Sequence, residues 1–199
     1  MGDQINFERI LEQEFRWPRP GDDPLANYGG ITASIAEDDF SRFVLMMEGY
    51  KRAAEALVDR CLKDWREANC LVFPIMFLYR HCLELQLKYI VNTYGVHVGC
   101  PPDWNTHDLT RLWGQFKKVL NEFGIDDPEQ TDSVVESIVA QFAKVDRDSS
   151  SHRYPCDTKG NPLPVIQDRV DLQTLKDVMD GAFGYFSGCD GYMDALASA

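Results

Sequence analysis

Basic residues are scarce in this sequence. The 199-residue chain has 20 Lys and Arg against 32 Asp and Glu, which gives a net charge of −12 at pH 7. Proteins that coat nucleic acids without sequence preference need clustered Lys and Arg to neutralise phosphates. The composition therefore excludes that class, whereas a small local site for RNA stays possible because it needs only a few contacts.

Patterns typical of metal and cofactor sites are also missing. The six cysteines are scattered, with no C-x-x-C pair and no Cys/His cluster at zinc spacing. The four histidines form no H-x-x-x-H or H-E-x-x-H pattern, and there is no Gly-rich phosphate loop, Ser-His-Asp order, or haem or flavin signature. We therefore expect neither a metal nor a cofactor.

Membrane and export signals are absent as well. The first fourteen residues are polar and acidic, unlike a secretory signal peptide. The longest apolar run, Cys70 to Tyr79, is too short to cross a bilayer. These features predict a cytoplasmic protein that does not insert into a membrane.

The apolar residues that are present recur at helical spacing along most of the chain. We expect an all-α, up-and-down bundle of about five main helices over residues 36–199, with a long loop from His152 to Arg169 before the last helix. Residues 1–35 are expected to hold a short helix at Ile5–Trp17 and an irregular Pro/Gly-rich arm. The main helices are expected at about 37–67, 70–94, 106–123, 128–145 and from 171 onward.

Local signals predict several helix ends. Pro74 fits the second main helix only within its first turn. Asn105 or Thr106 is expected to cap the third, and Gly124 to stop it. Asp127-Pro128-Glu129-Gln130 predicts an N-cap, a first-position proline and a capping-box partner for the fourth.

A polar stripe interrupts the most apolar predicted helix. Arg80, Glu84 and Lys88 follow at steps of four and His81 precedes Glu84 by three, so we expect all four on one side. If that side is buried, Arg80 and Glu84 must pair, because an unpaired buried charge is costly. Two interpretations stay open, namely a satisfied ion-pair cluster that fixes helix register, or a buried anion or nucleotide site using Arg80, His81 and Glu84.

His107 is a second candidate, in the first turn of the predicted third helix. There it can form a hydrogen bond that orders the preceding loop. Nothing in the sequence pairs it with a second metal ligand, so we predict a structural role for His107.

A third group of polar residues, Arg147, Asp148, His152 and Arg153, lies where the fourth helix is expected to end. Metal-free cleavage of RNA needs a base near the 2′-hydroxyl and a cation for the extra charge on phosphorus. His152 titrates in the range of the first role, and Arg147 or Arg153 suits the second. In a continuous helix, residues five apart point about 140° away from each other. Arg147 and His152 therefore converge only through a bend or through a second subunit.

An all-α hairpin bundle with an Arg-polar-x-x-x-His element near its C-terminal part resembles the HEPN superfamily. Arg147, Asp148 and His152 match the motif of its nuclease members. The stretches 79–88, 106–109 and 153–160 are also similar to uncharacterised bacterial HEPN-like proteins, and the resemblance spans most of residues 37–190. It implies a two-fold homodimer with facing motifs, and often a toxin or defence effector that works beside a nucleotidyltransferase-type antitoxin.

Two functions from different classes follow. In the first, a metal-independent endoribonuclease uses His152 as general base or acid, Arg147 to stabilise the phosphorane, and Asp148 or Arg153 to orient the pair. In the second, a non-catalytic helical module binds a protein partner or a small anionic or nucleotide ligand. The module would use its acidic surface, the Trp17-Pro18-Arg19-Pro20 arm and the Arg80/His81 pocket. The net charge of −12 favours the second function, because it repels RNA at long range.

Overall fold

The structure is a computed structural model, and it describes residues 20–25, 29–31, 33–35, 38–125, 127, 130–147, 149–163 and 168–198. The chain divides into two units, residues 1–35 and 36–199. The predicted helix at Ile5–Trp17 and most of the Trp17-Pro18-Arg19-Pro20 arm lie outside the described residues. The described part of the first unit consists of turns, bends and irregular backbone, with Gly21 and Gly29 at positive φ.

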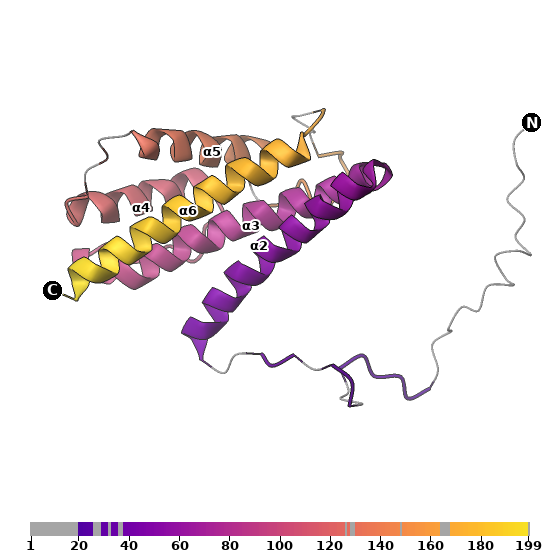
Figure 1. Cartoon of the computed structure of the whole chain (residues 1–199), viewed down its shortest axis with the longest axis horizontal. Helices are drawn as coiled ribbons and strands as arrows, with labels where there is room; N and C mark the ends of the chain where they lie inside the picture. Colours follow the sequence, from indigo (N-terminus) through magenta and orange to yellow (C-terminus); the bar gives the residue numbers. More distant parts are fainter. Residues whose placement is uncertain are drawn as a thin grey trace, which may run out of the picture. The chain divides into compact units, whose positions relative to one another are not determined.

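Helices form most of the described second unit, which contains no β-strand within those residues and is an all-α bundle as predicted. α3 lies in the middle, α2 packs beside it as a hairpin partner, α4 packs on α3, α5 on α4, and α6 across α2 and α3 (Figure 1). The elements in chain order are α2 (Asp39–Lys63), η1 (Trp65–Glu67), α3 (Ala68–Tyr94), η2 (Gly95–Val98), α4 (Leu109–Glu122), α5 (Thr131–Val145) and α6 (Leu172–Ala197).

α3 is the central and most apolar helix. The helical segment Trp65–Val98 is long and apolar enough to cross a membrane by length and composition alone, as are the core helices of some soluble proteins. In this structure α3 packs against three helices and buries the charged side chains Arg80, Glu84 and Lys88. The cellular location stays a prediction from the sequence.

Aromatic side chains of α4 and α6 pack against each other in the core. Trp113 and Phe116 of α4 pack against Tyr185 and Phe186 of α6, with ring centroids between 5.4 and 6.5 Å apart. Offset and edge contacts of this kind add to the stabilisation from burial alone. This packing holds α4 in place, and the segment that leads into α4 carries part of the candidate site.

Two of the predicted helix ends are confirmed. Asp171 is the N-cap of α6, and its side chain accepts a hydrogen bond from the Thr174 N–H at 2.7 Å. Gly124 follows α4 with a φ of 69°, a left-handed conformation that ends helices and favours glycine.

The predicted cap of α4 was wrong by two or three residues, so His107 precedes the helix and does not lie in its first turn. The N-cap is Asp108 and neither Asn105 nor Thr106, because the Asp108 carboxylate accepts from the N–H groups of Thr110 at 2.9 Å and Arg111 at 3.3 Å. The Thr106 hydroxyl instead accepts from the Asp108 N–H at 3.1 Å. The side chains of Thr106 and Asp108 therefore each accept a backbone hydrogen bond where the helix begins.

The predicted position of Pro74 was also wrong. α3 begins at Ala68, directly after η1, so Pro74 lies beyond the first turn and inside the helix. Proline cannot donate to the carbonyl four residues before it, which is that of Cys70. Cys70 is exposed, so water can serve its carbonyl oxygen.

α5 begins later than predicted. Its N-cap is Gln130, at a φ of 58°, and Gln130 makes no capping bond with its side chain. The Asp127 carboxylate takes that role from further back, because it accepts from the Thr131 N–H at 2.8 Å and the Asp132 N–H at 2.7 Å. Asp127 is thus a capping residue, as expected, but of a helix that starts at Thr131.

Candidate functional site

Arg80 is fully buried and joins three parts of the chain. Its Nε donates to the Asp146 carbonyl oxygen at 2.8 Å, and its Nη1 donates to Glu84 Oε2 at 2.9 Å. Its Nη2 donates to the carbonyl oxygens of His107 at 2.6 Å and Arg147 at 3.2 Å. One guanidinium on α3 therefore holds the segment before α4 next to the segment after α5.

Glu84 is the buried carboxylate beside Arg80. Its Oε1 accepts from Lys88 Nζ at 2.9 Å and faces His107 Nδ1 at 2.8 Å. Burial by itself would raise the pKa of Glu84, but hydrogen bonds from Lys88, His107 and Arg80 outweigh it and hold the pKa below its usual value. Glu84 is thus a charged acceptor for all three partners.

Asp146 is a second buried carboxylate on the same arginine. Its Oδ1 accepts from the N–H groups of Ser150 at 2.7 Å and Ser151 at 3.0 Å. Its Oδ2 lies 3.4 Å from His152 Nδ1 and 3.7 Å from Arg80 Nε. Burial opposes ionisation, but these bonds prevail and lower the pKa of Asp146 to about 2.

The chain bends sharply after α5, which is one of the two conditions under which Arg147 and His152 could converge. Ser149 has a φ of 58°, and the Ser150 carbonyl accepts from the N–H groups of Arg153 and Tyr154. The bend turns His152 back toward Asp146, where its side chain is only 12% exposed. Arg147 instead points outward, 78% exposed, with its Nε 3.9 Å from Asp108 Oδ2. The structure thus gives the two predicted partners different neighbours.

Asp148 and Arg153 are the other two predicted catalytic residues. Asp148 is outside the described residues. Arg153 donates from its Nε to the Ser149 carbonyl, and its guanidinium lies over the rings of Phe77 at 5.6 Å and Tyr154 at 5.5 Å. Arg153 therefore braces the loop against α3.

His81 does not share the contacts of Arg80 and Glu84, contrary to the expectation that all four stripe residues lie together. Its ring stacks on Phe77 at 5.6 Å and meets the edge of Tyr50 on α2 at 4.7 Å. Successive residues of a helix point about 100° apart, so His81 faces α2 while Arg80 faces the loops. Burial lowers the pKa of His81. Its surroundings, and the protein partners of Arg80, favour the structural interpretation of the stripe.

His107 was assigned a structural role from the sequence, and the structure adds a chemical feature. A carboxylate only accepts hydrogen bonds, so the Nδ1 that faces Glu84 must carry a proton, which leaves Nε2 of a neutral ring free to accept one. The ring is 60% exposed. Glu84 and His107 are 23 residues apart in the sequence, and no sequence motif predicts their contact.

His107 and His152 have the same kind of partner, with Nδ1 distances of 2.8 Å for the exposed His107 and 3.4 Å for the mostly buried His152. Each presents Nδ1 to a buried carboxylate, and both carboxylates contact Arg80. The exposed Arg147 guanidinium lies next to Asp108, the residue that follows His107. Two oriented imidazoles and a cation can together perform acid–base chemistry on a phosphate ester. Among the described residues, no group of three or more His, Cys, Asp or Glu is placed to hold a metal ion.

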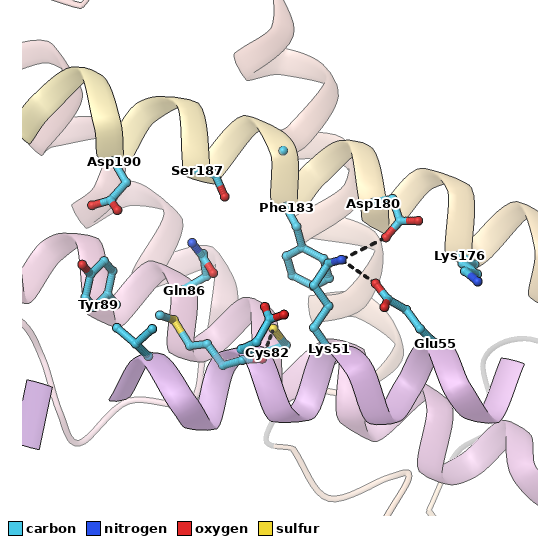
Figure 2. A pocket seen from close by; sticks show the side chains of 14 residues that line it. Lys51, Glu55, Cys82, Gln86, Tyr89, Lys176, Asp180, Phe183, Ser187 and Asp190 are labelled. Atoms are coloured by element: carbon cyan, nitrogen blue, oxygen red, sulfur yellow. Dashed lines mark hydrogen bonds and ion pairs between the residues drawn. The ribbon is translucent and has the colours of Figure 1, made fainter. Parts of the chain in front are cut away.

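A cleft of about 760 Å³ opens elsewhere, between α2, α3 and α6. Figure 2 shows Lys51 reaching from α2 between Glu55 and Asp180, with the ring of Phe183 behind it. Lys51 Nζ lies 3.3 Å from Asp180 Oδ1 and 5.8 Å from the centre of the Phe183 ring. The cleft is polar and carries charges of both signs.

Comparisons of the chain with protein-family models, with curated proteins and with solved structures give no match.

Replacement of Arg80 tests the structural core of this network. Arg80→Met keeps the bulk but removes one of the three partners of Glu84 and the Arg80 donors to three carbonyl oxygens, so we expect it to lower the free energy of unfolding by about 3–5 kcal/mol. Urea denaturation measures this, with Arg52→Ala, on the exposed side of α2, as the control. A loss under about 1 kcal/mol in Arg80→Met would contradict the assignment.

Acid unfolding tests Asp146. Its pKa is lowered from 3.8 to about 2 in the folded chain, so its contribution to stability is complete above pH 4 and is lost as the pH falls toward 2. We expect on the order of 2 kcal/mol from this group. The free energy of unfolding of Asp146→Asn should fall less steeply over that range than that of the wild type. Parallel pH profiles would show that Asp146 titrates as it does in the unfolded chain.

Proposed function

We propose that this protein is a metal-independent endoribonuclease of the HEPN type, with His107 and His152 as its acid–base pair and Arg147 as its cation. The observation that carries the proposal is the matched pair of imidazoles, each held at Nδ1 by a buried carboxylate that also contacts Arg80. The resemblance of Arg147 and His152 to the nuclease motif of that superfamily supports the same site from the sequence.

The proposed reaction is an internal transfer within RNA. Nε2 of one neutral imidazole removes the proton of a 2′-hydroxyl, whose oxygen attacks the adjacent phosphorus. The second imidazole, protonated, donates its proton to the leaving 5′-oxygen as the P–O5′ bond breaks. Arg147 stabilises the extra negative charge on the phosphorane. The products are a 2′,3′-cyclic phosphate and a 5′-hydroxyl, and the two histidines end with their protonation states exchanged.

The acidic surface shapes what such an enzyme can recognise. With a net charge of −12, the chain repels RNA at long range, so binding must come from a few contacts around Arg147. The resemblance adds a two-fold homodimer, whose second copy offers another route for Arg147 to meet His152, and an antitoxin or other protein partner. A role as a toxin or defence effector belongs to the same proposal.

Cleavage of a mixed RNA pool in EDTA tests the proposal. We expect the wild type to cleave RNA but not the matching DNA pool, which lacks the 2′-hydroxyl. His107→Gln and His152→Gln should each lower the rate by about 100- to 10,000-fold. His97→Gln is the matched control, because His97 is exposed in η2, away from both carboxylates. Thermal unfolding of each variant separates lost catalysis from lost folding, and full activity in the His107/His152 double variant would exclude this site.

A second candidate function is a module that binds a small ligand, and the cleft between α2, α3 and α6 favours it. Its volume of about 760 Å³ is in the range of small-molecule sites. Gln86 and Ser187 add uncharged hydrogen-bonding groups to the charges of Lys51 and Asp180 (Figure 2). A ligand that carries both charges, such as a free amino acid, matches this lining.

Filling the cleft tests this second function. Gly184 lines the cleft and has open space where a Cβ would lie, so Gly184→Leu should occupy the cleft without moving the helix. Gly188→Leu is the matched control, because Gly188 also has open space where a Cβ would lie but does not line the cleft. A screen of free amino acids by thermal shift should find one that raises the Tm of the wild type and of Gly188→Leu but not of Gly184→Leu. Equal shifts in all three proteins, or none in any, would exclude the cleft.

A further inference from the structure

A groove lined by aromatic rings lies beside the proposed nuclease site. Its volume is about 550 Å³, and Phe43 of α2, Tyr89 of α3 and Trp104 of the segment before α4 form its apolar part. The Phe43 ring lies 5.9 Å from that of Tyr89 and 6.0 Å from that of Trp104, both in tilted arrangements. The three rings come from three separate elements and meet only in the folded chain.

Trp104 is unusually open for the largest aromatic side chain. Trp104 is 49% exposed, whereas Tyr89, another ring of the groove, is buried. One part of the indole is packed on Phe43 and the rest faces solvent. An exposed aromatic surface over a groove is a platform on which a flat ring can stack, and every nucleobase has such a face.

The polar groups of the groove suit a nucleotide. Asn92 is exposed at its rim, and a side-chain amide offers both a donor and an acceptor to the edge of a base. Arg42 lies at the same rim, 3.2 Å from Asp39, in an exposed ion pair of the kind that contributes little to stability. A phosphate group can therefore replace Asp39 as the partner of the Arg42 guanidinium at little cost in free energy.

Trp104 connects the groove along the chain to the segment that carries His107. Trp104 precedes His107 by three residues, and three residues of extended chain span at most about 10 Å. Asp103 anchors this segment, because its Oδ1 accepts a hydrogen bond from the Asn105 N–H at 3.1 Å and its Oδ2 forms an ion pair with Arg111 Nη2 at 2.7 Å. A base on Trp104 thus lies within the reach of a short strand whose backbone passes His107.

We propose that this groove is a base-binding subsite for single-stranded RNA, in which an unpaired base stacks on Trp104 and meets Asn92 at its edge. The inference depends on the proposed nuclease function for its place beside His107. Base binding itself needs no cleavage, so the two can be tested apart. A paired base cannot enter, because stacking on Trp104 requires the base to leave its duplex.

The test is binding of a fluorescein-labelled, fully 2′-O-methylated single-stranded RNA, which cannot be cleaved through its 2′-oxygens. Fluorescence anisotropy at low salt should show that Trp104→Ala weakens binding about tenfold or more, while Trp104→Phe, which keeps a ring, retains most of it. Tyr192→Ala, an exposed aromatic residue of α6 outside the groove, is the matched control and should bind as the wild type does. Asn92→Asp places a negative charge at the rim and should weaken binding without removing a core side chain.

The outcomes separate the subsite from the nuclease. Ring-dependent binding supports the subsite even if no RNA is cleaved in EDTA, in which case only the proposed catalysis fails. The subsite is excluded if Trp104→Ala and Asn92→Asp bind as tightly as the wild type, if the oligonucleotide does not bind, or if a duplex of the same sequence binds equally well. Binding of a trimethyllysine peptide in place of RNA would show that the three rings bind a cation, and it would exclude the base-binding subsite.

Discussion

The burial of the Arg80 guanidinium is the constraint on which the rest of this structure depends. A charge in the middle of the core is tolerated only when its hydrogen bonds are made within the protein. Arg80 meets that condition with Glu84 and with the carbonyl oxygens of His107, Asp146 and Arg147. The same bonds draw two irregular segments onto α3, so the need to satisfy one arginine also builds the candidate site.

The two candidate functions use different faces of α3. The buried network involves positions 80, 84 and 88, whereas the cleft between α2, α3 and α6 is lined by positions 82, 86 and 89. Positions two apart on a helix point about 200° from each other, so the faces are nearly opposite. Substitutions on one face are therefore expected to leave the other face intact. The acidic composition disfavours broad RNA binding, but it is compatible with a site of few contacts on either face.

Apolar spacing was sufficient to predict the all-α bundle and most of α2, α3, α4 and α6, because helical periodicity is a local property of the chain. It was not sufficient for contacts made between elements. The pairing of Glu84 with His107 joins residues 23 positions apart on two elements. The turn of His152 toward Asp146 depends on the positive φ of Ser149, and serine gives little signal for that conformation. The sequence indicated Arg147 and Asp148, while the carboxylate that holds His152 is the neighbouring Asp146.

In the proposed site, buried carboxylates hold His107 and His152 by Nδ1 and leave Nε2 as the proton acceptor. ¹H–¹⁵N NMR of the imidazole nitrogens at neutral pH measures this tautomer, and it is tractable with four histidines in the chain. We expect neutral His107 and His152 each to carry the proton on Nδ1, with His152→Gln and His107→Gln identifying the two sets of signals. A proton on Nε2 of either neutral ring would exclude the proposed acid–base pair, because that nitrogen could no longer take a proton from a substrate.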